Sequence, residues 1–204
     1  RGADAPLPIA PAGRRLGIEP GVVGMDHRQD RRDAGVGEQG ADRARDLPQK
    51  PVYVLGNATA NWNRQVSSMH DLTVTSASQS GREAFAMAGL TPADMNVVQL
   101  YDAFTITPLL ALEDLGFCAR GESGAFAEAG QLTLGGALPC NTDGGGLASN
   151  HPGKRGIFAL IEGVRQLRGQ GPGVQIPNAE TALVHGLGGT FCAAATASSA
   201  VSTA

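Results

Sequence analysis

The stretch TPADMNVVQLYDAF, residues 91–104, contains a helix start, a short apolar strand and the entry to a second helix. Thr91 can cap a helix that Pro92 begins, and a carboxylate stands in its first turn, so one helical turn is predicted. The run 96–101 predicts a strand, and Asp102 can cap the helix that follows. Strands that alternate with helices are typical of an α/β layer fold.

The same alternation extends to both sides of this stretch. We expect further strands and helices, in chain order, at 51–56 (strand), 81–88 (helix), 104–115 (helix), 152–167 (helix), 180–185 (strand) and 190–196 (strand). The last two strands flank a glycine turn and should form a hairpin. The glycine-rich segment 117–138 predicts loops with short strands. The expected fold is an α/β domain at 51–197, with a mixed β-sheet flanked by helices.

One apolar stripe predicts the buried face of the helix at 152–167, and Pro152 can take its first position. Charged side chains lie off this stripe. Its members are Ile157, Leu160, Ile161, Val164 and Leu167. After the hairpin, the tail 198–204 is expected to fray.

The N-terminal segment differs in composition from the rest of the chain. Its first 50 residues hold nine basic and eight acidic side chains, while the other 154 hold seven and eleven. Residues 1–45 show neither a helical stripe nor strand alternation, so we expect a disordered or atypical segment. An arginine-rich arm for an anionic partner is the alternative, but the interleaved acids cancel its charge.

Composition excludes several classes of function. A net charge of −3 argues against nucleic acid as a partner. No apolar run is long enough to span a membrane, and no secretory signal begins the sequence, so a cytoplasmic protein is expected. Cys118, Cys140 and Cys192 share no C-x-x-C spacing, which favours reduced thiols, and no metal site is predicted.

The first candidate loop joins a strand to a helix at Tyr101 to Phe104. On open α/β sheets, ligand sites gather at the ends of strands. Tyr101 could act in such a site, or it could be a core residue with a satisfied hydroxyl group. Asp102 could also serve a site, but capping the next helix explains it without one.

Two glycine-rich loops each carry a histidine. Residues 141–153, NTDGGGLASNHPG, contain three consecutive glycines, which let a backbone approach a ligand or turn sharply. His151 stands at the predicted helix start, where the helix dipole favours a neutral imidazole that can accept a proton. His185 ends an apolar strand before the turn at 186–189. A capping or surface role for the first histidine and a buried, hydrogen-bonded state for the second are the alternatives. Together with Tyr101 they form a plausible acid–base set.

These motifs carry a family resemblance. YDAF at 101–104 stands where thiolases carry NEAF, NHPG at 150–153 where they carry GHP, and HGLGG at 185–189 where many carry CGGG. From about Val52 to Thr196 the chain resembles the C-terminal half of the thiolase superfamily. It is most similar to thiolase-like proteins of the lipid-transfer or sterol-carrier-protein-X type.

The resemblance implies a role for each motif. Thiolases act as acyltransferases on coenzyme A thioesters, without a permanently bound cofactor. The histidine of GHP, here His151, activates a nucleophilic cysteine and helps to stabilise the oxyanion. Tyr101 replaces an asparagine that orders a water molecule, and His185 replaces a cysteine that shuttles a proton. The resemblance also implies substrate contacts from Phe104, Asn141, Gly145, Gly146 and Gly188.

The resemblance covers only one half of a thiolase. The nucleophilic cysteine and most loops that bind coenzyme A lie in the other half, so a truncated or out-of-frame gene product would explain the sequence. Cys192 is expected to be a buried core residue. Since the two halves of a thiolase pack together, we expect an apolar exposed face here. The expected partners are acyl-CoA and either a second copy or the missing half.

Two other functions remain open at this point. Some thiolase-like proteins are retro-aldolases that cleave acyl-CoA side chains with tyrosines and work with an OB-fold partner. Tyr101 resembles one such tyrosine, but the segment 147–149 lacks a second. The chain could also be a non-catalytic module that binds a lipid-CoA.

Overall fold

The computed structural model describes residues 21–24, 37–39, 47–150 and 153–201. Six strands form one sheet in the order β2-β1-β3-β6-β5-β4. In chain order they are β1 (Gly21–Gly24), β2 (Gly37–Gln39), β3 (Val52–Asn61), β4 (Val97–Leu100), β5 (Thr181–Gly188) and β6 (Ala193–Val201). β4 runs parallel to β5, and every other pair is antiparallel, which confirms the predicted mixed sheet.

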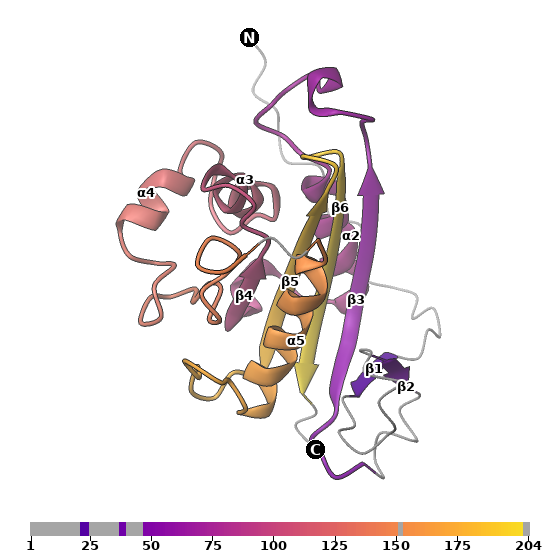
Figure 1. Ribbon diagram of the computed structural model, residues 1–204, viewed down its shortest axis with the longest axis vertical. Helices are drawn as coiled ribbons and strands as arrows, with labels where there is room; N and C mark the ends of the chain where they lie inside the picture. Colours follow the sequence, from indigo (N-terminus) through magenta and orange to yellow (C-terminus); the bar gives the residue numbers. More distant parts are fainter. Residues whose placement is uncertain (1–20, 25–36, 40–46, 151–152, 202–204) are drawn as a thin grey trace.

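Helices cover both faces of this sheet (Figure 1). α2 (Ala77–Ala88) and α3 (Ile106–Asp114) pack on one face, and α5 (Arg155–Arg168) packs on the other. The remaining helical segments are α4 (Ser123–Glu128), η1 (Val66–Ser68) and η2 (Pro92–Asp94). This arrangement confirms the α/β class that the sequence predicts.

The sheet face under α2 and α3 is covered by a closely packed apolar core. Leu100 and Leu183 are fully buried there together with Leu112 of α3. Phe85 of α2 meets Phe117 edge to face at 6.4 Å between ring centroids. Burying side chains of this size supplies much of the free energy of folding.

Close packing between α2 and β3 depends on Gly56. A Cβ atom at this position would overlap the carbonyl oxygen of Ala84 and lie 2.8 Å from the amide nitrogen of Ala88. Backbone atoms of a helix cannot move aside as a flexible side chain can. Gly56 therefore sets the distance between helix and sheet.

We predict that Gly56→Ala lowers the free energy of unfolding by about 2 kcal/mol or more, because overpacked cores cost this much. Gly124→Ala is the matched control, since Gly124 lies in α4 and a Cβ atom added there would meet no heavy atom within 4 Å. Alanine favours a helix over glycine, so the control should be neutral or stabilising. Urea unfolding of both variants checks this, and equal stabilities would contradict the packing argument.

Several local predictions are confirmed. Thr91 and Asp94 form a reciprocal capping box around η2, with Asp94 Oδ2 accepting bonds of 2.7 Å from both the amide and the hydroxyl of Thr91. β5 and β6 form the expected hairpin, although β5 continues through the first glycines to Gly188. Cys192 is buried, as predicted, but it lies in the turn just before β6 rather than in a strand.

Other predictions are wrong in position or extent. The glycine-rich segment 117–138 forms turns and α4 rather than short strands. α5 begins at Arg155, later than predicted. Ile157, from its predicted buried stripe, is 49% exposed, and Leu160 is only partly buried, because the sheet beneath that side of α5 is left uncovered. Glu162 is 2% exposed instead.

Both ends of the predicted domain are more extensive than expected. Ser198 and Ser199 of the supposed frayed tail are buried in β6, which pairs with β3 and β5 up to Val201. Within the segment 1–45, β1 pairs with β3 through the register Val22 to Tyr53, so β-branched residues there extend the sheet. The rest of the predictions for 1–45 and for 202–204 fall outside the described residues.

Candidate functional site

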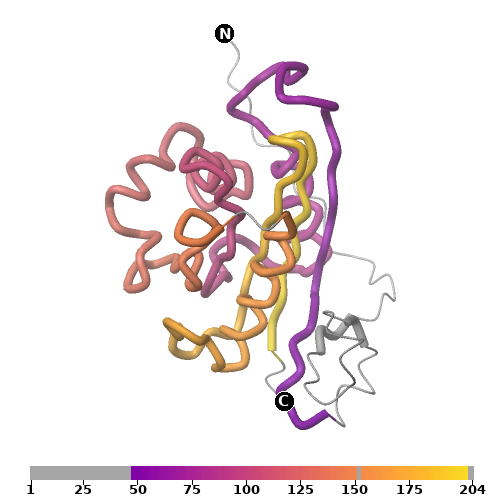
Figure 2. Tube along the Cα trace, in the orientation of Figure 1, coloured from indigo at the N-terminus to yellow at the C-terminus, as the bar shows by residue number. Residues whose placement is uncertain are grey.

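The predicted site loops meet at one edge of the sheet. Because β4 and β5 are parallel, their carboxyl ends lie at the same edge, which is where α/β sheets place their ligand sites. The amide of Tyr101 continues this pairing and donates to the carbonyl of His185 at 3.0 Å. The chain after β3 arches over the same edge (Figure 2), and the amide of Trp62 donates to the carbonyl of Cys192 at 3.1 Å.

Asp102 holds the glycine loop, residues 143–147, against this edge. Its Oδ1 accepts a 2.6 Å hydrogen bond from the amide of Gly146, and its Oδ2 accepts one of 3.1 Å from Leu147. The prediction that Asp102 caps the next helix is wrong, because α3 begins only at Ile106. The carboxylate instead bonds to backbone that lies more than 40 residues ahead in sequence.

The start of the glycine-rich segment extends the sheet. The side-chain oxygen of Asn141 accepts a 2.8 Å hydrogen bond from the backbone amide of Leu100. The backbone amide of Asn141 donates to the carbonyl of Val98 at 3.0 Å. Asn141 adopts a left-handed backbone conformation with φ of 50°. The oxygen of this side chain is thus engaged by the protein, and the substrate contact assigned to Asn141 stays a prediction.

Buried polar side chains tie the same segment to α5. Thr142 donates to Glu162 Oε1 at 2.6 Å and accepts from Gln99 at 2.9 Å. Gln166, one helical turn after Glu162, donates to the same carboxylate at 2.8 Å. Each of these side chains is nine-tenths or more buried. Buried polar groups that are linked in this way fix geometry, although Gln99 Oε1 accepts no hydrogen bond among the described residues.

The sequence analysis missed this network and a second anchor on α5. Arg155 is 7% exposed and pairs with Asp143 at 2.7 Å. Both Arg155 and Glu162 lie off the apolar stripe, so the pattern indicates solvent-exposed positions. The i, i+4 spacing of Glu162 and Gln166 is a signal that could have flagged a shared partner.

His185 lies in β5, paired with Leu100 of β4. Its side chain is fully buried on the face of the sheet that α2 covers, and its Nδ1 lies 3.0 Å from the hydroxyl of Thr196. That hydroxyl lies 2.9 Å from the hydroxyl of Ser80 on α2. Its strand neighbour Val184 faces α5 instead, beside Gly163. The imidazole is thus buried with Nδ1 beside a hydroxyl group, while its Nε2 has no hydrogen-bond partner among the described residues. The acid–base role of His185 stays a prediction.

Burial lowers the pKa of His185 from 6.5 to about 4. The folded state thus holds the neutral imidazole, while the unfolded chain binds a proton below pH 6.5. We predict that the free energy of unfolding falls by about 3 kcal/mol as the pH drops from above 6.5 to 4.

Urea unfolding across this pH range tests the prediction. His185→Gln should remove most of the pH dependence between 6.5 and 4. The exposed His70 provides the matched control, since His70→Gln should leave the dependence unchanged. The same slope in His185→Gln and the unmutated chain would contradict the assignment.

The other predicted site residues have varied surroundings. Tyr101 is partly buried at the end of β4, and its carbonyl accepts a 3.1 Å bond from Thr107. Phe104 is 57% exposed, and Gly188 is exposed at the end of β5. Gly145 is buried under Asp102, while Gly146 is only partly so. His151 lies outside the described residues, so its place in an acid–base set with His185 and Tyr101 remains a prediction.

The surroundings of the cysteines oppose a nucleophilic thiol. All three cysteines of the chain are free. Burial raises the pKa of Cys140 to about 12, and the charges of Asp102 and Asp143 act in the same direction. Burial also raises the pKa of Cys118, and Cys192 is 6% exposed. A reactive cysteine needs a lowered pKa and access to solvent.

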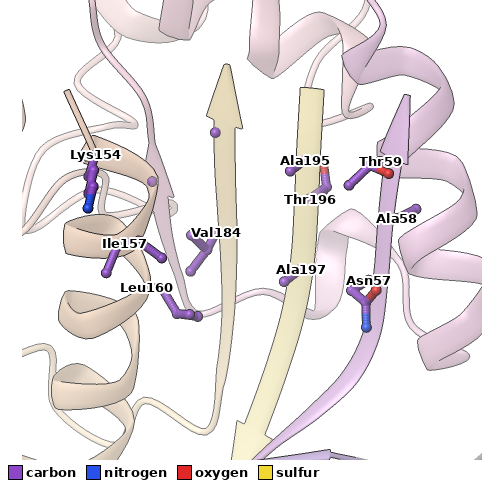
Figure 3. Close-up of a pocket in the computed structure, with 12 residues that line it drawn as sticks. Asn57, Ala58, Thr59, Lys154, Ile157, Leu160, Val184, Ala195, Thr196 and Ala197 are labelled. Atoms are coloured by element: carbon purple, nitrogen blue, oxygen red, sulfur yellow. The ribbon is translucent and has the colours of Figure 1, made fainter. Parts of the chain in front are cut away.

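An open groove of about 410 Å³ lies between α5 and β3 (Figure 3). Ile157 and Leu160 form one wall, and the polar side chains of Asn57 and Thr59 stand on β3 at the other. The floor consists of small or branched residues of β5 and β6, namely Val184, Gly186, Ala195 and Ala197. This apolar, uncovered face agrees with the prediction of an exposed apolar surface.

Metal binding and membrane insertion each need side chains of a particular kind. Among the described residues, no cluster of three or more histidine, cysteine, aspartate or glutamate side chains could hold a metal ion. No helix in the same part of the chain is long and apolar enough to cross a membrane.

Comparisons with known proteins agree with the fold. The family model for the thiolase C-terminal domain-like family matches residues 58–198. An acetyl-CoA acetyltransferase of Methanothermobacter thermautotrophicus is 41% identical over 152 residues, which are 74% of this chain and 40% of the relative. The rat (Rattus norvegicus) protein named sterol carrier protein 2 is 38% identical over 111 residues, or 54% of this chain and 20% of that protein.

A solved structure is similar as well. The structure named "Ltp2-ChsH2(DUF35) aldolase" superimposes with a TM-score of 0.72 and 34% identity, over 81% of this chain and 43% of that one. The chain thus spans less than half of the relatives that it matches. The family model covers well over half of the chain, and the motif order and the mixed sheet agree with it. The chain belongs to the thiolase superfamily, and its described domain is a thiolase C-terminal-like domain.

Proposed function

We propose that this chain is the acid–base half of a thiolase-like acyltransferase that acts on acyl-CoA thioesters. The observation that carries the proposal is the edge at which β4 ends beside β5 and Asp102 holds the glycine loop, while burial raises the pKa of the Cys140 thiol to about 12. A relative that matches most of the chain is named acetyl-CoA acetyltransferase. His151 acts as the base, Tyr101 lies beside the reacting carbonyl, and acyl-CoA is the substrate, with no permanently bound cofactor.

The groove between α5 and β3 is the proposed binding site for the other half of the thiolase-like enzyme. Its apolar wall consists of Ile157, which is exposed, and Leu160, which is partly buried. The chain spans only 40% of the acetyltransferase relative. Exposed apolar surfaces of this kind mark contact sites. In this proposal the nucleophilic cysteine comes from the half that binds in the groove. A homodimer and a cytoplasmic location complete the proposal.

A chimera tests the catalytic role of this domain. It joins the part of the Methanothermobacter relative that precedes the matched region to residues 51–201 of this chain. We expect thiolysis of acetoacetyl-CoA, and His151→Ala should lower kcat by roughly 10²–10⁴ because a general base is lost. A folded chimera that binds acetoacetyl-CoA without turning it over would favour a non-catalytic binding module instead.

A second candidate function is retro-aldol cleavage of an acyl-CoA side chain. Two observations favour it: a tyrosine, Tyr101, follows β4 where thiolases carry an asparagine, and the similar structure is named as an aldolase together with ChsH2(DUF35). For this function the chain works with an OB-fold partner. The same chimera separates the two functions. Retro-aldol cleavage of a β-hydroxyacyl-CoA in the absence of thiolysis, and the loss of this cleavage in Tyr101→Phe, would support the second function.

A further inference from the structure

Three consecutive amides of the glycine loop are bound by aspartate carboxylates. Gly145 donates to Asp143 Oδ1 at 2.9 Å, Gly146 to Asp102 Oδ1 at 2.6 Å, and Leu147 to Asp102 Oδ2 at 3.1 Å. Consecutive amides in such a turn commonly form a concave site for an anion from a ligand. Here the protein itself supplies the anions.

The two carboxylates are held from different directions. Asp102 is 4% exposed and follows β4, so its position is fixed by the sheet. Asp143 also accepts a 2.7 Å bond from Arg155, the first residue of α5. The loop is thereby connected to the sheet on one side and to α5 on the other. Bonds from amides to a carboxylate are stronger than those between neutral groups.

The glycine loop has little room for side chains next to the carboxylate of Asp102. A Cβ atom on Gly145 would lie 2.9 Å from Asp102 Cγ, and one on Gly146 would lie 3.0 Å from Asp102 Oδ1. The carboxylate therefore excludes a side chain at position 145 and leaves little room for one at position 146. The small size of these glycines needs no bound ligand as its explanation.

We propose that Asp102 is a positioning residue that fixes the glycine loop beside Tyr101, and that the loop's amides serve Asp102 and Asp143 rather than an anionic group of the substrate. This inference rests on the proposed function only in treating the edge as the acyl-CoA site. It reassigns Gly145 and Gly146, for which substrate contacts were predicted, to the support of the loop. A substrate at this edge meets the exposed side of the loop, where Leu147 is 55% exposed.

Chemical rescue tests the role of the carboxylate in the full chain without any acyl-CoA. Asp102→Ala removes one carboxylate group and leaves the amides of Gly146 and Leu147 unpaired. Their hydrogen exchange, measured by NMR, should accelerate by roughly tenfold or more. Sodium formate should restore protection, because formate matches the deleted group, whereas sodium chloride at the same ionic strength should not.

Leu112→Ala is the matched control, since Leu112 is fully buried in α3 and its loss creates a cavity without freeing an amide. Formate should leave the exchange of this variant unchanged. If Asp102→Ala does not fold, Asp102→Asn replaces it; an asparagine can accept from only one of the two amides, so exchange should accelerate at the other alone. Unchanged protection of both amides, or a folded Asp102→Ala variant that formate does not rescue, would overturn the proposal. Because no thioester is used, this outcome is separate from any failure of the catalytic proposal.

Discussion

Gly145→Ala is expected to release the glycine loop from the sheet edge and to lower the free energy of unfolding by about 3 kcal/mol or more. Two effects add at this position. The residue adopts a φ of 71°, which costs any side chain with a Cβ atom. The new methyl group would also overlap the Asp102 carboxylate and approach the Asn141 amide nitrogen to 3.0 Å.

The control for this variant isolates the backbone cost. Gly121 has a φ of 82°, and a Cβ atom added there would meet no heavy atom within 4 Å. Gly121→Ala should therefore cost only about 1–2 kcal/mol. Urea unfolding of the two variants measures the difference, and faster exchange of the Gly146 amide should accompany Gly145→Ala alone. Equal losses of stability in the two variants would show that Asp102 leaves room for a side chain.

The second large effect is the expected absence of thiolysis by the isolated chain. Removing a covalent nucleophile costs on the order of 10⁴–10⁶ in rate. Of the three thiols, Cys140 has a pKa of about 12 and Cys192 is almost fully buried. Burial and the charges of Glu113 and Glu122 raise the pKa of Cys118. A neutral thiol is a poor nucleophile and a buried one is hard to reach, so we expect none of the three cysteines to form an acyl-enzyme at a useful rate.

Elements governed by local rules could be predicted from the sequence. The capping box at Thr91 depends on residues three positions apart. The hairpin of β5 and β6 was also predicted, although its turn lies after Gly188 rather than at 186–189. The strand after Thr91 is marked by a run of β-branched and apolar residues. These signals need no knowledge of the rest of the fold.

Features set by long-range contacts could not be predicted in this way. Asp102 is a plausible helix cap from its sequence position, and only the folded chain brings Gly146 to it. Helical periodicity assigns Glu162 to the solvent face of α5, and its burial follows only once Thr142 and Gln166 are placed beside it. The face of the sheet on which the His185 side chain lies could not be predicted either. β5 is buried on both sides, so its sequence has no alternation of polar and apolar residues.

The meeting of two of the predicted loops could be inferred from the sequence, whereas the contacts that hold them together could not. Tyr101 and the glycine loop do lie together at the carboxyl end of β4, as the motif order implies. The sequence did not predict the contacts that Asp102 makes with the amides of Gly146 and Leu147, and the substrate roles of the predicted site residues stay predictions. The order of the motifs indicates which loops lie close together. The contacts of each side chain depend on residues far away in the sequence, which the spacing of the motifs does not reveal.

The most direct test of the account is intact-mass spectrometry of the 204-residue chain after incubation with acetyl-CoA, together with an assay of acetoacetyl-CoA thiolysis in the presence of coenzyme A. The account predicts an unmodified mass and no thiolysis above the uncatalysed rate, because the acid–base half has no activated thiol. Robust thiolysis, or a stoichiometric acyl adduct on Cys118, Cys140 or Cys192, would contradict it and would assign that cysteine as the nucleophile.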